Sequence, residues 1–368
     1  IADLTERTLA AFRQDMADLK ALPPTFEPRA TEHVEDMVSM IERLVDSGHA
    51  YVAHGNVLFE VAADPGYGRL SKREREEAIP VDRVPVEPWK KAREDFALWK
   101  PSGDGEPGWD SPWGRGRPGW HIECSAMARR YLGSAFDVHA GGQDLIFPHH
   151  ENEIAQSACC GDASANVWLH NGHVMVDGAK MAKSAGNFTT VRDLLDSGRA
   201  GETVRMAVLS AHYRAPLDLS AEKLDEAKAA LDRFYRAVEA AGAEAGEAPP
   251  PDGVVEALAD DLNTPAAIAE LHREAAAVFA AAGGGAKAEA AARLRAGGRV
   301  LGMLGDSAEE WFRGADAASD EIERLVARRS EARANRDFAT ADRIRDDLKA
   351  RGVAIEDRPD GSAAWRFE

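Results

Sequence analysis

The sequence contains Gly-Trp-His-Ile-Glu-Cys at residues 119–124, Phe-Pro-His-His-Glu-Asn-Glu at 147–153 and Lys-Met-Ala-Lys-Ser at 180–184. Over residues 119–200, short apolar segments alternate with helical patterns, as a parallel α/β sheet requires. One stretch therefore carries a thiol, imidazoles, carboxylates and a lysine-bearing loop. Each of these groups has a chemical use, and together they indicate a site for a metal ion and a nucleotide.

The second cluster predicts a metal site. His149 and Glu153 are four residues apart, which on a helix places both side chains on one face. Cys124 adds a soft thiolate, and a set of sulfur, nitrogen and oxygen ligands suits zinc better than magnesium or calcium. Three protein ligands leave one position open, which is the arrangement of a reactive zinc site. The alternative is an ordinary helical pair beside a buried, apolar cysteine.

The same helical geometry predicts that the residues next to His149 and Glu153 do not bind the metal. Pro148 suits the first turn of the helix, and His150 and Glu151 point away from the metal. Cys159 and Cys160 lie two turns beyond Glu153, and we expect them to pack in the interior rather than to bind metal.

The third cluster predicts a phosphate site. Lys180 and Lys183 flank a short Met-Ala segment between Gly178 and Gly186, so two ammonium groups lie on a stretch that can move. Such lysines stabilise charge that builds up on a transferring phosphoryl group. The preceding run, residues 168–178, is typical of a buried strand that leads into a glycine turn. A pair of solvated surface lysines is the alternative.

Composition sets the remaining bounds. The chain has 368 residues and 44% hydrophobic content, which is enough for two or three domains with their own cores. The sequence shows neither a secretory signal nor an apolar run of transmembrane length. Three cysteines argue against a disulfide framework and for a reducing compartment. We therefore expect a cytoplasmic protein with no membrane partner.

The charge is unevenly distributed. A net charge of −18 does not by itself suggest a nucleic-acid partner, because phosphate contacts need local positive charge. Residues 319–368, however, contain eleven Lys and Arg against twelve Asp and Glu, so this tail contributes only −1. Its arginines gather at Arg324, Arg328, Arg329, Arg333 and Arg336. A nucleic-acid surface and an ordinary solvated helical face are both compatible with this pattern.

Taken in order, these segments resemble the cysteinyl-tRNA synthetases, class I enzymes whose Lys-Met-Ser-Lys-Ser loop corresponds to residues 180–184 here, with Ala182 in place of the middle serine. The resemblance runs from Glu27-Pro-Arg-Ala-Thr and Gly48-His-Ala-Tyr-Val to the end near Trp365. It implies an α/β fold, with a Rossmann-like parallel-sheet catalytic domain that is incomplete and carries an insertion, then a helical bundle and a small α+β anticodon-binding domain.

The resemblance also implies the reaction and its partners. A monomeric cysteine–tRNA ligase is expected, which uses ATP with Mg²⁺ to convert L-cysteine to cysteinyl-adenylate and transfers the cysteine to tRNA(Cys). Zn²⁺ is expected to bind the substrate thiol. Because a thiolate can complete the zinc tetrahedron and a serine hydroxyl cannot do so well, this ligation can separate cysteine from serine without an editing domain.

Site residues follow from the resemblance position by position. The matching residues are Cys124, His149 and Glu153 for zinc, Trp120 and Asp144 for the substrate, His139, Lys180 and Lys183 for catalysis, Gly141 and Gly142 with both lysines for ATP, and Arg333, Asp342 and Asp357 for the anticodon. Two positions depart from the family, Ala182 in the loop and Ala140, where the family has glycine. We expect the loss of the loop serine to alter hydrogen bonding rather than to abolish function.

The family's remaining signature is expected in a segment before Ile1 that this chain lacks. That segment carries a His-Ile-Gly-His motif, whose histidines stabilise the reacting triphosphate, and a fourth zinc-binding cysteine. His170-Asn-Gly-His173 matches the motif only by its letters, because it directly precedes the lysine loop. We therefore expect a truncated or incompletely recorded polypeptide that can be inactive as it stands.

The resemblance divides the chain into five parts. They are a helical segment and connective insertion at 1–118, the second half of the catalytic domain at 119–200, a stem-contact helical connection at 201–250, a tRNA-binding helical bundle at 251–318 and the anticodon-binding domain at 319–368. Two alternatives remain open. One is a cysteine ligase of mycothiol synthesis, which shares the zinc site but lacks the last domain, and the other is a noncatalytic fragment that binds zinc and tRNA.

Overall fold

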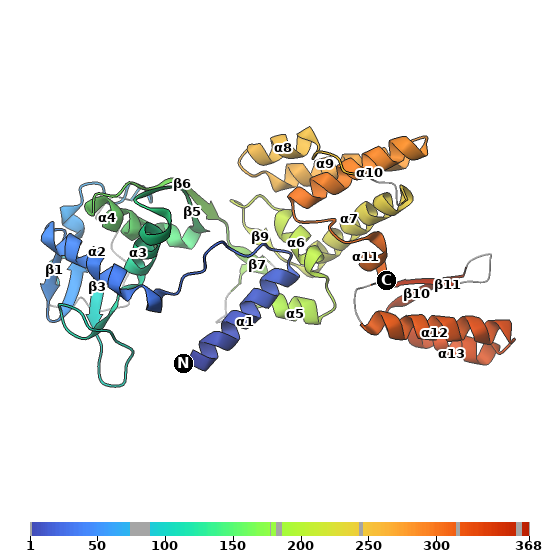
Figure 1. The fold of residues 1–368 in the computed structure, drawn as a ribbon, viewed down its shortest axis with the longest axis horizontal. Coiled ribbons are helices and arrows are strands. Elements are labelled where there is room, and N and C mark those ends of the chain that lie inside the picture. Colours follow the sequence, from blue (N-terminus) through green and yellow to red (C-terminus); the bar gives the residue numbers. More distant parts are fainter. Residues whose placement is uncertain are drawn as a thin grey trace. The chain divides into compact units, whose positions relative to one another are not determined.

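The computed structural model describes residues 2–73, 89–176, 178–181, 186–242, 246–313, 317–357 and 363–367. The chain divides into two compact units, shown in Figure 1, which we describe separately. The sheet unit comprises residues 24–173 and 213–216, and the helical unit comprises residues 1–23, 174–212 and 217–368. Within the described ranges, no helix has both the length and the apolar character needed to cross a membrane.

The sheet unit begins with a helix and an antiparallel sheet. Helix α2 (Val34–Asp46) buries Val34, Met37, Ile41 and Leu44, an apolar stripe at helical spacing that explains why this segment folds onto a core. Strands β1 (Ala50–Ala53), β2 (Asn56–Phe59), β3 (Phe96–Pro101) and β4 (Gly116–Pro118) follow in spatial order β1-β2-β3-β4. Strands β1 and β2 pair as an antiparallel hairpin.

A parallel strand pair forms the other half of the sheet unit. Helix α3 (Trp120–Leu132), strand β5 (Ala135–Gly142), helix α4 (Glu151–Cys159) and strand β6 (Ser164–Asn171) follow one another along the chain. Strands β5 and β6 are parallel, with His139 opposite Trp168, so the carboxyl ends of both strands meet at one edge. This strand–helix–strand arrangement confirms the α/β interpretation of residues 119–171.

The core of the sheet unit is formed by residues of helices α2, α3 and α4 and of strands β1, β2 and β3. Met37, Leu98, Trp99 and Ile122 are fully buried in it. Cys160 is buried in the same core and Cys159 packs partly buried against it, which confirms that these thiols are packing residues.

Residues 168–176 do not form the single buried strand that the sequence suggested. Strand β6 ends at Asn171 and is largely half-buried or exposed, and a separate strand, β7 (Val174–Val176), belongs to the helical unit. The break lies at Gly172, whose N–H donates to the carbonyl of Tyr213. A side chain at Gly172 would begin 2.3 Å from the Ala215 carbonyl oxygen, so only glycine permits this close approach.

The helical unit contains a small sheet and a helical bundle. Strands β8 (Ala179–Lys180), β7 and β9 (Leu217–Asp218) pair in that order. The helices are α1 (Ala2–Asp18), α5 (Val191–Asp196), α6 (Gly201–Leu209), α7 (Ala221–Ala240), α8 (Asp252–Ala259), α9 (Thr264–Ala280), α10 (Gly284–Val300) and α11 (Ala308–Arg313). Helices α7, α9 and α10 pack against one another (Figure 1), around a core that includes Leu231, Phe234 and Leu271.

Local signals in the sequence predicted the ends of these helices. Asn263 caps α9 by accepting from the Ala266 N–H, and Pro265 lies in its first turn. The alanine-rich stretch of this region breaks near Gly283, between α9 and α10. Thr190 and Asp193 form a reciprocal capping box at the start of α5, the helix that follows the lysine loop.

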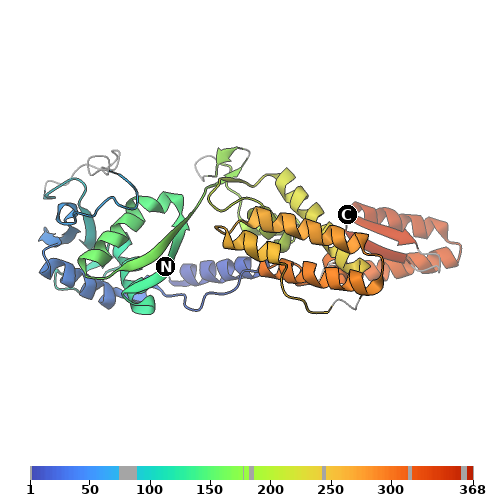
Figure 2. The ribbon, with the colours of Figure 1, turned by 90° about the horizontal axis from the view of Figure 1, so that it is seen from above.

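The C-terminal residues fold as the expected helix pair and strand pair. Helices α12 (Ala317–Ala334) and α13 (Phe338–Ala350) lie against the antiparallel strands β10 (Val353–Asp357) and β11 (Ala363–Phe367), as Figure 2 shows. They share a core of their own, made by Ile322, Val326, Ile344, Leu348, Val353 and Trp365. Gly352 ends α13 with φ +72°, a conformation that favours glycine.

Candidate functional site

The structure brings Cys124, His149 and Glu153 together. Cys124 comes from α3, His149 from the turn before α4 and Glu153 from α4 itself. One ligand atom of each residue lies within 4.8 Å of the other two, and His149 Nε2 lies 2.9 Å from Glu153 Oε1. His149 and Glu153 are buried and Cys124 is half-buried. A thiol, an imidazole and a carboxylate therefore converge from three segments on one small volume.

The chemistry of these three groups fits a bound cation. Glu153 Oε1 is buried and accepts no hydrogen bond from any residue in the described ranges, so its contact with His149 lacks the alignment of a hydrogen bond. A buried carboxylate oxygen without a donor is costly. Burial, followed by the charges of Glu153 and Glu123, raises the pKa of Cys124 to about 12, so this thiol needs a nearby positive charge to ionise. A zinc ion among the three groups would satisfy both requirements.

His121 orients His149, although no sequence argument singled it out. Their Nδ1 atoms lie 2.7 Å apart, so one ring donates its N–H to the other. Burial, followed by His149, lowers the pKa of His121 to about 4, which keeps this ring neutral. When His149 donates through Nδ1, its Nε2 is free to face Glu153. The signal was present, because His121 precedes Cys124 by three residues, on the same side of α3.

Trp120 lies beside this group. Its ring packs on His149 with the ring centroids 4.5 Å apart, and the residue is 60% exposed. An exposed aromatic face thus borders the His149 imidazole, at the open side of the cluster.

A second group of imidazoles shares Glu153. His139, His150 and Glu153 also place ligand atoms within 4.8 Å of one another, with His139 Nε2 3.4 Å from Glu153 Oε2. The Nδ1 of His150 lies 2.8 Å from His170 Nε2, and His139 stacks on Trp168. Burial, followed by His139 and the other neighbouring histidines, lowers the pKa of His150 to about 3. His150 is therefore neutral at physiological pH.

The expectation that His150 points away from this site is wrong. The chain kinks at Phe147, which has extended dihedral angles (φ −136°, ψ 131°), and it is helical from Pro148 into α4, so Pro148 lies in the first turn of that helix as expected. The residue before a proline favours such an extended conformation. The placement of His150 depends instead on the packing of this turn near β5 and β6, which carry His139 and His170.

Glu151 does face away from the metal group, where it has a structural task. It is 1% exposed, and its carboxylate accepts hydrogen bonds from the backbone N–H groups of residues 68, 70 and 71 at 3.0, 3.4 and 2.8 Å. The next residue, Asn152, accepts a hydrogen bond of 2.6 Å from the Tyr67 hydroxyl. Two consecutive residues at the start of α4 thus attach the segment 67–71 to the helix that carries Glu153.

The glycine turn after β5 is tightly packed. A Cβ at Gly141 would lie 2.8 Å from His150 Cε1, and one at Gly142 would lie 2.5 Å from Asp144 Oδ1. Gly141 therefore faces a buried ring that leaves little room for a side chain, whereas the Asp144 carboxylate near Gly142 is exposed and can move aside. Asp144 is exposed in the turn that follows, and Ala140 is exposed on β5, so the methyl group that replaces the family's usual glycine meets no crowded surface.

The lysine loop is only partly described. Lys180 ends strand β8, but its side chain and the whole of Lys183 and Ala182 lie outside what the structure describes. The roles assigned to these residues therefore stay predictions.

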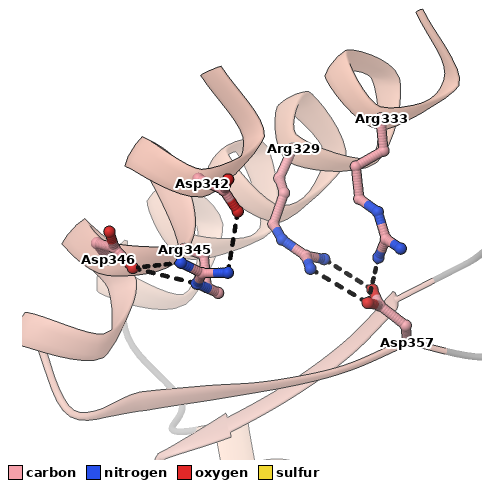
Figure 3. Close-up of polar contacts among 6 residues, drawn as sticks. All are labelled: Arg329, Arg333, Asp342, Arg345, Asp346 and Asp357. Carbon is pink, nitrogen blue, oxygen red and sulfur yellow. Dashed lines mark hydrogen bonds and ion pairs between the residues drawn. The ribbon is translucent and has the colours of Figure 1, made fainter. Parts of the chain in front are cut away.

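The residues predicted to read the anticodon fall into two separate groups, shown in Figure 3. Asp357, on β10, accepts two hydrogen bonds from Arg329, at 2.7 and 3.2 Å, and a further one from Arg333. Asp342 instead pairs with Arg345 at 2.9 Å. Hydrogen bonding by Arg329, together with that of Arg333, lowers the pKa of Asp357 to about 2. Arg333 and Asp357 are thus paired with each other and Asp342 is not part of their cluster.

Three family models match the chain. The one described as "tRNA synthetases class I (C) catalytic domain" matches residues 1–229, the "DALR domain" matches 253–305 and the "Cysteinyl-tRNA ligase anticodon binding domain" matches 315–366. The chain is 52% identical to the cysteine–tRNA ligase of Rhodospirillum rubrum and 54% identical to that of Paramagnetospirillum magneticum. Each alignment covers 100% of this chain and 81% of the relative.

A solved structure shares the fold. The chain aligns with methionyl-tRNA synthetase of Mycobacterium tuberculosis in complex with methionyl-adenylate, with a TM-score of 0.52 over 86% of this chain and 82% of that one. The sequence identity is 14%, so this likeness speaks for a class I synthetase fold alone.

Proposed function

Since the chain belongs to the cysteine–tRNA ligase family of class I aminoacyl-tRNA synthetases, we propose that it activates L-cysteine with ATP and Mg²⁺ and transfers the cysteine to tRNA(Cys). The first step forms cysteinyl-adenylate and releases pyrophosphate, and the second passes the aminoacyl group to the terminal ribose of the tRNA. The observation that carries this proposal is the convergence of Cys124, His149 and Glu153 on one volume that suits zinc.

The same three residues would hold the zinc ion. A zinc ion held there would supply Lewis-acid chemistry that stabilises the substrate thiol as a thiolate. His121 keeps the His149 ring in the tautomer whose Nε2 is free, and Glu153 contributes the buried oxygen that lacks a hydrogen-bond donor. Discrimination against serine of roughly ten-thousand-fold requires about 5.5 kcal/mol, which is more than a difference in pocket shape usually supplies.

The residues around this group would position the substrates. The exposed ring of Trp120 borders His149 and would form a wall for the amino acid. His139 lies within β5 and Asp144 just after it, near the carboxyl end of the strand, where α/β folds bind their ligands. Gly141 and Gly142 allow close approach of the nucleotide at the same strand end. In the lysine loop, Lys180 and Lys183 would stabilise the pyrophosphate as it leaves.

The remaining parts of the chain would bind tRNA. We assign the stem-contact role to residues 201–250, the helical bundle to 251–318 and anticodon binding to 319–368, in line with the matches of the DALR and anticodon-binding models. Arg333 and Asp357, each 45% exposed, and Asp342, at 62%, can still offer hydrogen bonds to splayed bases. The anticodon-binding match weighs against a cysteine ligase of mycothiol synthesis.

The setting of the enzyme follows from the same proposal. A cytoplasmic location agrees with the low cysteine content, which suits a reducing compartment, and we propose a monomer there. Gel filtration of the purified protein tests the monomer.

The proposal is tested with the protein expressed from its full gene. Cysteine-dependent exchange of pyrophosphate into ATP and charging of tRNA(Cys) are expected, and serine should support neither. Cys124→Ser should lose bound zinc and lower kcat/KM for cysteine by roughly 100-fold or more. Cys159→Ser is the matched control, because that thiol packs in the core and should leave both values unchanged. Equal exchange with serine, or no charging of tRNA(Cys), would contradict the proposal.

A further inference from the structure

Among the arginines of helices α9 and α10, two differ from the others in having no ion-pair partner within the described residues. In helices α9 and α10, Arg273 pairs with Glu270 at 2.6 Å, and Arg293 pairs with Glu274 and Glu289 at 3.1 and 3.2 Å. Arg295 and Arg299 form no ion pair or side-chain hydrogen bond with any residue that the structure describes. They lie four residues apart on α10, where two like charges repel each other.

Both arginines line one hollow. It holds about 540 Å³ and lies between α10 and the segment 246–250. Its lining residues are Gly246, Glu247, Ala248, Pro250, Ala292, Arg295, Ala296, Arg299 and Val300. Ala292 and Ala296, one turn apart on the same helix, leave the space open between the longer arginine side chains. The Nε atom of Arg295 is buried and has no hydrogen-bond partner within the described ranges.

The hollow therefore presents guanidinium hydrogen-bond donors of Arg295 and Arg299 that have no acceptor among the described residues. A buried guanidinium N–H that lacks an acceptor is costly, and the repulsion between neighbouring guanidinium groups adds to this cost. Glu247 also lines the hollow, but no ion pair with either arginine is found among the described residues. A bound anion with several acceptor oxygens would accept hydrogen bonds from the accessible guanidinium N–H groups of Arg295 and Arg299 and offset the repulsion, and phosphate has this geometry.

We propose that Arg295 and Arg299 form a phosphate-binding site of α10 that takes the sugar–phosphate backbone of RNA. The hollow is far larger than a single phosphate needs and is open, so a continuous chain can enter and leave it. The inference rests on the proposed function, which makes tRNA the RNA concerned. It adds a positively charged contact in the bundle of a chain whose net charge is −18.

The test measures the binding of tRNA(Cys) to the protein at several salt concentrations. The double variant Arg295→Gln with Arg299→Gln should bind more weakly, and the slope of log affinity against log salt should become less steep by roughly 1.4 to 1.8, the value for two lost phosphate contacts. Arg273→Gln is the matched control, because it removes a charge from the same bundle at a residue that is already paired and 72% exposed. Its slope should match that of the unchanged protein.

Three outcomes would overturn the inference. They are an unchanged slope in the double variant, an equal change in the Arg273→Gln control, and tight binding of inorganic phosphate that depends on both arginines while the tRNA slope stays the same. The last would assign the site to a small anion. If the unchanged protein fails to bind tRNA(Cys) at all, the proposed function fails as well. Pyrophosphate exchange, measured in parallel, shows whether the double variant is folded.

Discussion

The Nε2 atom of His149 lies 2.9 Å from Oε1 of Glu153, a buried carboxylate oxygen that accepts no hydrogen bond from the described part of the chain. Two groups that can both bind a cation thus face each other in the interior. Cys124 completes the group from another helix. The predictions below start from this relationship and from the contacts that surround it.

Removing the Glu153 charge should release the metal. We expect Glu153→Gln to lose at least about 90% of bound zinc at equimolar metal, because an amide is a poor zinc ligand. Metal content of the purified protein, measured by elemental analysis, checks this. Glu123→Gln is the control, since Glu123 lies on the same helix as Cys124 but outside the group of three, and it should keep its zinc.

Loss of the His121 ring should weaken zinc binding without removing a ligand. His121→Ala leaves the Nδ1 of His149 without its partner, so the ring is free to turn, and a loss of about 10- to 100-fold in zinc affinity is expected. His121→Asn retains an acceptor and should recover part of the affinity. Competition with a chelator of known affinity measures both variants. If Asn and Ala behave alike, His121 does not act by holding the His149 tautomer.

The Glu151 carboxylate should hold the segment 67–71 in place. Glu151→Ala leaves three backbone N–H groups without their acceptor, and we expect faster hydrogen exchange at residues 68, 70 and 71, equivalent to about 3 kcal/mol of local stability. Tyr67→Phe, which removes only the single hydrogen bond to Asn152, should cost about 1 kcal/mol. Equal exchange in the two variants would show that the carboxylate is not the main attachment.

The Asp357 cluster should stabilise the C-terminal fold above acidic pH. Its pKa in the folded protein, about 2, is below the ordinary value of 3.8, so the contribution is present above pH 3.8 and is lost as pH falls through 2. Because the side chain is 45% exposed, the contribution is discounted to about 1 kcal/mol. An NMR titration of this carboxyl should give the low midpoint.

Asp357→Asn should remove this pH dependence together with the stabilisation. Asp342→Asn is the control, because Asp342 belongs to a separate pair with Arg345. If tRNA binding falls in the Asp357 variant while urea unfolding is unchanged, the residue contacts RNA rather than stabilising the fold.

Much of the fold follows from short-range patterns. The cap at Asn263, the break near Gly283 and the stop at Gly352 involve residues within a few positions of one another, so their geometry is encoded locally. The parallel pair of β5 and β6 likewise follows from the alternation of apolar and helical segments. The interpretation of residues 168–176 as one strand was wrong because the interruption at Gly172 depends on residues 213–216, about forty positions later.

By itself, the sequence determined which residue types form the candidate metal site, the order of the helices and strands, and the family. Residue types, helical spacing and short motifs are local properties of the chain. Only the tertiary structure decided that His121 supports His149, that His150 joins His139 and Glu153, and that Asp342 is separate from the pair of Arg333 and Asp357. These relationships cross between helices and strands, so they depend on how the elements pack. Glu153 shows the difference most clearly. Its spacing of four residues from His149 can be read from the sequence. That its buried oxygen has no hydrogen-bond donor among the described residues depends on the side chains packed around it.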